Sequence, residues 1–195
     1  MNSQRGAPVI ASFLRWFFGH LYTTAAWGYD GVAWLSSLGQ WSAWRRTALA
    51  RIPPGPRVLE LGFGTGHLQV EAGRRGLQIL GVDASAQMAR LSRRRLRRAG
   101  LPLTVVQARA QALPFPSHAL GSAFSTFPSE YIFDLQALAE IRRVLAPGGS
   151  LLVVLSARIL PRYPWEHLTR WLYQLSGQAP GPDPKWLAAF LQAGF

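Results

Sequence analysis

Three glycines at alternate positions, directly behind a short apolar segment, constrain this chain more than any other feature. Gly62, Gly64 and Gly66 follow the segment Val58-Leu-Glu-Leu61, and a helix is expected from His67 onward. The glycines therefore lie at a strand-to-helix turn. Because glycine has no Cβ, it adopts positive φ and lets the backbone approach a ligand, toward which the first N–H groups of the helix point. The segment predicts a nucleotide-type binding loop.

Charge narrows the choice of ligand. Glu60 stands two residues before Gly62, where its carboxylate would repel a phosphate and suit an ammonium group. The dinucleotide fingerprint also places its third glycine one residue later than Gly66. Asp83 directly follows a second predicted strand, residues 78–82, at the spacing where a carboxylate binds ribose hydroxyls. Both carboxylates fit an adenosine that carries an amino acid instead of phosphates.

Strand-like and helix-like segments alternate along the rest of the chain. Ser85 and Asp134 are expected to cap two of the helices. The alternation predicts an α/β fold, a Rossmann-like doubly wound parallel sheet with helices on both faces. The continuous apolar run 150–155 indicates a strand buried on both faces. The predicted strands are 58–61, 78–82, 103–107, 120–126 and 150–155, and the helices are 67–75, 85–99, 134–145 and 184–192.

Four segments in the same order resemble the class I S-adenosylmethionine-dependent methyltransferases, in particular small-molecule enzymes with a type 11-like domain. They are the glycine loop 60–66, the acidic strand end 81–85, Met88, and the helix, turn and strand of residues 138–152. The resemblance runs from about Val58 to Leu155 and implies the fold predicted above and S-adenosylmethionine as cofactor. The cofactor-binding residues that it implies are Glu60, Gly62, Gly64, Gly66, Asp83, Ala84, Met88, Arg109, Ala110 and Ser125.

The chain departs from the family pattern in two places. Many relatives carry an aspartate beside the adenine amino group, where this chain has Arg109, which cannot accept that hydrogen bond. Backbone groups of Ala110, or Gln111, are the candidate substitutes, and weaker cofactor binding is the alternative. Relatives also continue past a Gly-Phe pair like 194–195 into two antiparallel strands. Either the chain is truncated or its sheet lacks that pair, which would leave 150–155 at an edge.

The resemblance also predicts the acceptor side of the site and the domain boundaries. Residues 1–52 are expected to form a helical lid over a methyltransferase domain of residues 53–195. The acceptor is expected to be small and apolar or aromatic, and collinear positioning in a dry pocket requires no obligatory base. Glu130 and Tyr131 are candidate acid or base groups, and Glu130 equally fits a helix start. The acceptor-side candidates are Tyr22, Tyr29, Thr126, Phe127 and Glu130.

Composition excludes some chemistry. The chain has no cysteine, which rules out a thiol nucleophile and cysteine-ligated metals, and its four histidines show no metal-ligand spacing. We therefore predict no metal site. The aromatic N-terminal segment is interrupted by Arg15 and Asp30, so its charge-free pieces fall short of the roughly 20 residues of a spanning helix. A cytoplasmic protein, either free or peripheral to a membrane, is expected.

Net charge is +12, and six arginines between Arg90 and Arg98 crowd one predicted helix, whose Met88, Leu91 and Leu96 are expected to face the sheet. A solvated arginine-rich face and contact with anionic membrane or nucleic acid are both open readings. The alternative to an enzyme is a non-catalytic, basic S-adenosylmethionine-binding protein on lipid or nucleic acid. A nicotinamide-dependent oxidoreductase is a third interpretation. The oligomeric state is open.

Overall fold

The computed structural model describes residues 47, 49–52, 57–155 and 184–195. All of them belong to one compact unit, Trp44–Leu155 with Asp183–Phe195. Nearly all of the predicted lid, including Tyr22 and Tyr29, lies outside the described residues.

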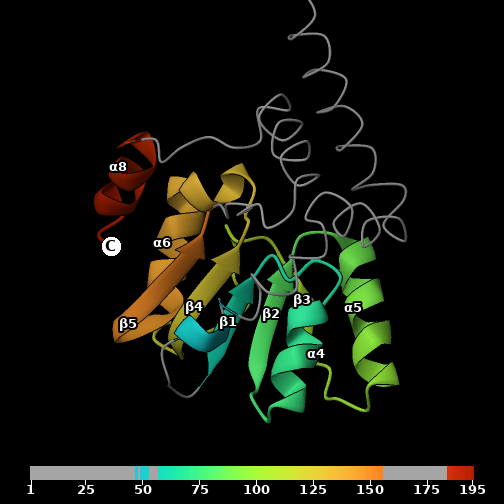
Figure 1. The fold of residues 1–195 in the computed structure, drawn as a ribbon. Helices are drawn as coiled ribbons and strands as arrows, with labels where there is room; N and C mark the ends of the chain where they lie inside the picture. Colours follow the sequence, from blue (N-terminus) through green and yellow to red (C-terminus); the bar gives the residue numbers. More distant parts are fainter. Residues whose placement is uncertain (1–46, 48, 53–56, 156–183) are drawn as a thin grey trace, which may run out of the picture. The chain divides into compact units, whose positions relative to one another are not determined.

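A five-stranded sheet forms the centre of this unit. Its strands are β1 (Val58–Leu61), β2 (Ile79–Asp83), β3 (Val105–Gln107), β4 (Leu120–Thr126) and β5 (Leu145–Val154). They lie in the order β3-β2-β1-β4-β5, and every neighbouring pair is parallel. The strands in Figure 1 therefore end at one common edge, which carries the glycine loop. The predicted Rossmann-like α/β fold is confirmed.

Helices follow the strands where the sequence predicts them. They are α4 (His67–Arg74), α5 (Ala86–Arg98), the 3₁₀ helix η1 (Glu130–Phe133), α6 (Leu135–Val144) and α8 (Pro184–Gln192). Both predicted caps are confirmed. Ser85 Oγ accepts from Met88 N at 3.3 Å, and Asp134 Oδ1 accepts from Gln136 N at 2.9 Å. Each cap satisfies an N–H group that the first helical turn cannot pair internally.

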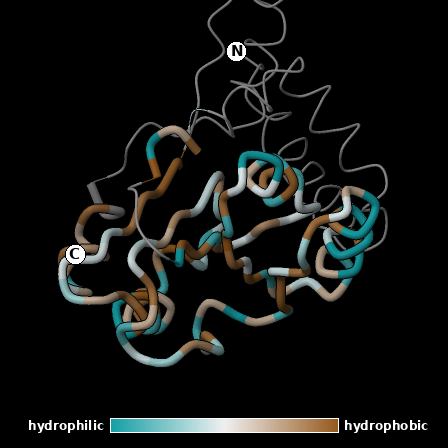
Figure 2. The backbone as a smooth tube through the Cα atoms, turned by 90° about the horizontal axis from the view of Figure 1, so that it is seen from below, coloured by the Kyte–Doolittle hydropathy of each residue, from teal (hydrophilic) through white to brown (hydrophobic). Residues whose placement is uncertain are grey.

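The two faces of the sheet carry separate apolar clusters, because successive side chains of a strand point to opposite faces. Leu59 and Leu61 of β1 belong to the cluster that includes Leu138 and Ile141 of α6. Val58 belongs to the opposite cluster, with Leu68 and Ala72 of α4. In Figure 2, α5 at the right is largely hydrophilic, and the strands between the helices are richer in hydrophobic residues. Helices therefore cover both faces, as predicted.

Strand β5 differs from its prediction in burial and extent. Residues 150–155 are half-buried throughout, so the expected burial on both faces is wrong. Within the described residues, β5 pairs only with β4 and lies at the edge of the sheet. The strand also begins at Leu145 instead of Ser150, and its register with β4 shifts between Leu120 and Ser122. Pro147, Gly148 and Gly149 thus lie in an irregularity of the strand.

Two smaller predictions are also corrected. Strand β3 begins at Val105, because the chain turns just before it, where Thr104 N donates to Pro102 O at 3.1 Å. Leu91 of α5 is half-buried, whereas Met88 and Leu96 are buried as expected. The buried stripe of α5 runs through Met88, Ala89, Ser92 and Leu96, a narrower face than the sequence indicated.

Candidate functional site

The three glycines of the loop all have positive φ, but their surroundings differ. Their φ angles are 73° at Gly62, 54° at Gly64 and 79° at Gly66. A Cβ on Gly66 would lie 2.1 Å from Ser92 Oγ of α5, so this glycine permits the packing of α4 against α5. A Cβ on Gly64 would meet no described atom within 4 Å. The loop is therefore packed against α5 at Gly66 and has open space beside Gly64. This space leaves the backbone at Gly64 accessible to a ligand.

Asp83 ends β2 beside this opening. Its Oδ2 accepts from Gly64 N at 2.9 Å, and its Oδ1 accepts from Ser85 N at 2.8 Å. Burial raises the pKa of Asp83, and these two hydrogen bonds partly offset that rise. A carboxylate offers about four acceptor positions. Two of them hold the glycine loop and the start of α5, and the remaining capacity fits the two hydroxyls of a ribose.

Glu60 lies on β1, the neighbour of the strand β2 that carries Asp83, and its side chain contacts α4. It pairs in register with Gly81, two residues before Asp83, so the two carboxylates occupy neighbouring strands as predicted. Glu60 is only 2% exposed, and its Oε2 accepts from Gln69 Nε2 of α4 at 2.6 Å. Gln69 in turn accepts from Thr104 Oγ1 at 3.1 Å. Direct contact of Glu60 with an ammonium group stays a prediction.

Of the residues predicted to surround adenine, the structure brings the loop with Arg109 and Ala110 to the end of β2, whereas Met88 is buried on α5. Ala108 N donates to Asp83 O at 3.0 Å, which brings the loop carrying Arg109 and Ala110 beside the end of β2. Arg109 and Ala84 are exposed, and Ala110 is half-buried. Met88 is 4% exposed and lies in the core of the α5 face, so its contact with adenine stays a prediction. Gln111 instead donates to Asp134 Oδ2 at 2.6 Å.

The described residues that were predicted for the acceptor side lie at the end of β4 and just after it. Ser125 is buried, Thr126 and Phe127 are half-buried, and Glu130 is exposed at the start of η1. Phe127 has a φ of 52°, and its N–H donates to Val154 O at 2.8 Å. Left-handed backbone at an aromatic residue costs about 1–2 kcal/mol, and such strain is concentrated at functional sites.

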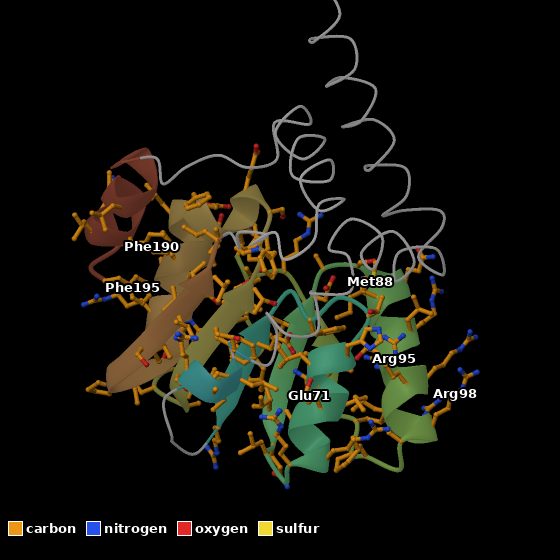
Figure 3. The ribbon with its side chains drawn as sticks, in the orientation of Figure 1. Glu71, Met88, Arg95, Arg98, Phe190 and Phe195 are labelled. Atoms are coloured by element: carbon orange, nitrogen blue, oxygen red, sulfur yellow. The ribbon has the colours of Figure 1, made fainter. Side chains whose placement is uncertain are left out.

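Three contacts of this region were missed by sequence reasoning. They are the hydrogen bond from Gln69 to Glu60, the hydrogen bond from Tyr131 Oη to Leu61 O, and the hydrogen bond from Arg95 Nη1 to Thr65 O. Arg95 also lines an open pocket on α5 with Leu91, Arg94 and Arg98. Figure 3 shows Arg95 beside the glycine loop and Arg98 pointing away from the molecule. No local pattern signals these contacts, since Arg95 and Thr65 are 30 residues apart.

The described residues contain no group of three or more histidine or acidic side chains that could bind a metal ion. In the same part of the chain, no helix is long and apolar enough to span a membrane.

Comparison with known proteins agrees with this geometry. Residues 59–153, from β1 to β5, match the methyltransferase domain family. This match agrees with the resemblance of the four segments to the class I S-adenosylmethionine-dependent methyltransferases.

Two relatives are named as methyltransferases for quinones or for quinone biosynthesis. The chain is 38% identical over 145 residues to the ubiquinone/menaquinone biosynthesis C-methyltransferase of Xanthomonas campestris, covering 70% of this chain and 57% of the relative. It is 36% identical over 139 residues to the demethylmenaquinone methyltransferase of Thermus thermophilus, covering 69% of this chain and 63% of the relative. The chain thus spans less than two thirds of the length of these relatives.

Solved structures share the fold. A geranyl diphosphate methyltransferase in complex with S-adenosylmethionine has a TM-score of 0.58 and 23% identity, and the match covers 78% of this chain and 64% of that one. The [4+2]-cyclase SpnF also has a TM-score of 0.58, with 25% identity over 78% of this chain and 56% of its own. The fold therefore accommodates more than one reaction.

Proposed function

We propose that this protein binds S-adenosylmethionine and transfers its methyl group to a small aromatic acceptor, the ring of a reduced quinone. The open glycine loop held by Asp83 carries the cofactor part of this proposal, because Asp83 binds Gly64 N and retains acceptor capacity toward the open side. The quinone relatives carry the acceptor part. A reduced ring is required because its hydroxyl oxygens make a ring carbon nucleophilic, whereas the oxidised ring is electrophilic.

The bound cofactor supplies an electrophilic methyl group on a sulfonium. Transfer of that group to a ring carbon would leave a neutral sulfide and would require the ring carbon to lose a proton. The chain contributes binding and alignment: the glycine loop and Asp83 hold the adenosine end, and the end of β4 frames the acceptor. Alignment in a water-poor site is sufficient for a large part of the acceleration. Glu130, exposed beside this site, is the candidate to accept the ring proton.

Calorimetry and a methyl-transfer assay test the proposal together. We expect micromolar binding of S-adenosylmethionine and S-adenosylhomocysteine, and none of NAD. With reduced 1,4-naphthoquinone as probe, labelled methyl groups should appear on the ring. Asp83→Ala should abolish cofactor binding, because the ribose loses its acceptor and Gly64 N loses its partner.

The outcomes separate the alternatives. Unchanged affinity in Asp83→Ala would show that the ribose assignment is wrong. Cofactor binding without methyl transfer to any aromatic probe would favour the non-catalytic protein, or a reaction of another class such as that of the cyclase. Binding of NAD alone would favour an oxidoreductase.

We also propose that the basic face of α5 contacts an anionic membrane. The pocket there is lined by an apolar residue, Leu91, and by Arg94, Arg95 and Arg98, of which Arg94 and Arg98 are exposed. A mixed apolar and cationic surface suits the boundary between headgroups and acyl chains. A surface that binds only the nucleic-acid backbone has no use for the apolar part.

A further inference from the structure

Arg95 of α5 contacts the glycine loop and also borders the open pocket on the basic face of the helix. Its Nη1 donates to Thr65 O of the loop. The same side chain lines the pocket, with Leu91, Arg94 and Arg98. Arg95 is half-buried and is drawn beside the glycine loop in Figure 3. A guanidinium has five N–H donors, so one bond to the loop does not use up its capacity. One side chain can therefore hold the loop and a ligand of the pocket together.

A series of hydrogen bonds and rigid peptide groups leads from Thr65 O to Asp83. Thr65 O and Gly66 N belong to one peptide group, and Gly66 N donates to Phe63 O at 3.1 Å. Phe63 O and Gly64 N belong to another peptide group, and Gly64 N donates to Asp83 Oδ2 at 2.9 Å. Because a peptide group is planar, fixing its carbonyl oxygen also fixes the direction of its N–H. The orientation of Thr65 O thus influences the N–H group that holds Asp83.

Helix α5 is also packed against the glycine loop three residues before Arg95. Ser92 is fully buried, and it leaves no room for a Cβ on Gly66. Thr65 is only 5% exposed, so the loop backbone is enclosed at the point where Arg95 reaches it. Close packing at Ser92 keeps the helix in place against the loop. The side chain of Arg95, and not the helix as a whole, is therefore the part that a ligand of the pocket can order.

The pocket suits a phosphate that carries an apolar group. Its four residues are spaced i, i+3, i+4 and i+7 along α5, so they lie on one face of the helix. Arg94 and Arg98 are exposed, whereas Leu91 and Arg95 are half-buried. Guanidinium groups bind phosphate oxygens through paired N–H donors. Leu91 beside them suits the glycerol and acyl region of a lipid, which inorganic phosphate lacks.

We propose that this pocket binds the headgroup phosphate of an anionic lipid, and that the bound phosphate strengthens cofactor binding through Arg95. The phosphate accepts from Arg95 and holds its side chain in the orientation that also donates to Thr65 O. Fixing a long arginine side chain costs rotamer entropy, and a phosphate that is already bound removes this cost from cofactor binding. This inference rests on the proposed function, because it adds regulation by the membrane to the proposed cofactor site.

Equilibrium dialysis of S-adenosylhomocysteine at fixed ionic strength, with and without phosphatidylglycerol vesicles, measures the coupling. This ligand is suitable because it lacks the sulfonium charge that would attract S-adenosylmethionine to the vesicles. We expect the vesicles to lower its Kd about fivefold, the lower end of the usual coupling between two sites. Phosphatidylcholine vesicles and inorganic phosphate should each leave the Kd within about twofold of its value in buffer. An equal gain with inorganic phosphate would overturn the assignment to a lipid.

Arg95→Lys separates the positive charge from the contact with the loop. Lysine keeps the charge, so the variant should still bind the vesicles, but one ammonium group does not replace a guanidinium that spans a phosphate and Thr65 O. Its Kd for S-adenosylhomocysteine should therefore be the same with and without vesicles. Arg97→Gln is the matched control, because Arg97 is exposed on the same helix but does not line the pocket. It loses a charge and should keep the full effect of the vesicles on the Kd.

A reciprocal measurement on the wild type completes the test. Saturating S-adenosylhomocysteine should increase vesicle binding by the same factor by which vesicles lower the Kd. A vesicle effect that persists in Arg95→Lys overturns the inference, as does its absence in a wild type that binds both vesicles and S-adenosylhomocysteine, and both results leave the cofactor site standing. Failure of the wild type to bind S-adenosylhomocysteine at all overturns the proposed function itself.

Discussion

At the scale of single residues, the glycines of the loop predict separable effects. Gly66→Ala should lower the free energy of unfolding by roughly 1–2 kcal/mol for left-handed backbone, and by about 1–3 kcal/mol more for crowding. The crowding arises because the new methyl group would meet Ser92, which is fully buried. Urea unfolding measures both contributions together.

Gly76→Ala isolates the backbone contribution, since Gly76 has a φ of 74° and its Cβ would meet nothing within 4 Å. Gly64→Ala has the same open surroundings, so its loss of stability should match that of Gly76→Ala. Only Gly64→Ala should also weaken S-adenosylhomocysteine, because its methyl group projects into the ligand space. Equal stability of the Gly66 and Gly76 variants would contradict this account.

At the scale of an element, α5 has a buried stripe against the sheet and a basic outer face. Arg94 and Arg98 are exposed on that face. Replacing both by glutamine should weaken binding to phosphatidylglycerol vesicles by about 1 kcal/mol per arginine. Vesicle sedimentation at low and physiological salt measures the loss, which added salt should diminish.

The control for α5 removes the same charge elsewhere. Arg74 and Arg75 are exposed at the end of α4, and Arg75 pairs with Glu71 at 2.7 Å. Replacing both by glutamine should leave vesicle binding nearly unchanged. An equal effect of the two double variants would mean that net charge, and not α5, is responsible. Tighter binding to RNA than to vesicles would favour nucleic acid as the partner.

At the scale of the whole molecule, ligand binding is coupled to folding. S-adenosylhomocysteine at about 100 times its Kd should stabilise the fold by about 2.7 kcal/mol, and NAD should not. Burial raises the pKa of Asp83, so its ionised form disfavours folding of the ligand-free protein above that pKa. The ionised carboxylate of Asp83 is also the form that accepts hydrogen bonds from the ribose. The stabilisation by ligand should therefore be present at neutral pH and decline as pH falls through the folded pKa of Asp83.

Thermal melts from pH 4 to pH 7, with and without ligand, test this coupling. Asp83→Ala should show no ligand-induced shift at any pH. A wild-type shift that grows as pH falls would contradict the role of the Asp83 carboxylate.

Local signals made the order and most boundaries of the elements predictable. Strand β4 was predicted over the residues that form it, and Ser85 and Asp134 act as caps because their side chains bind N–H groups two or three residues away. Burial was harder to predict. The apolar run 150–155 is compatible with a central strand, but its half-burial depends on how many strands flank it. Likewise, Leu91 follows the helical period but lies at the margin of the buried face.

The amino-acid sequence by itself determined the fold class, the glycine loop and the two neighbouring carboxylates, because glycine spacing and strand alternation act over a few residues. Tertiary structure alone decided which side chains meet around the glycine loop. Glu60 meets Gln69 across a helix and a strand, and Tyr131 reaches Leu61 from 70 residues away. Such contacts depend on how separate elements pack against each other, and no short-range sequence pattern predicts that packing.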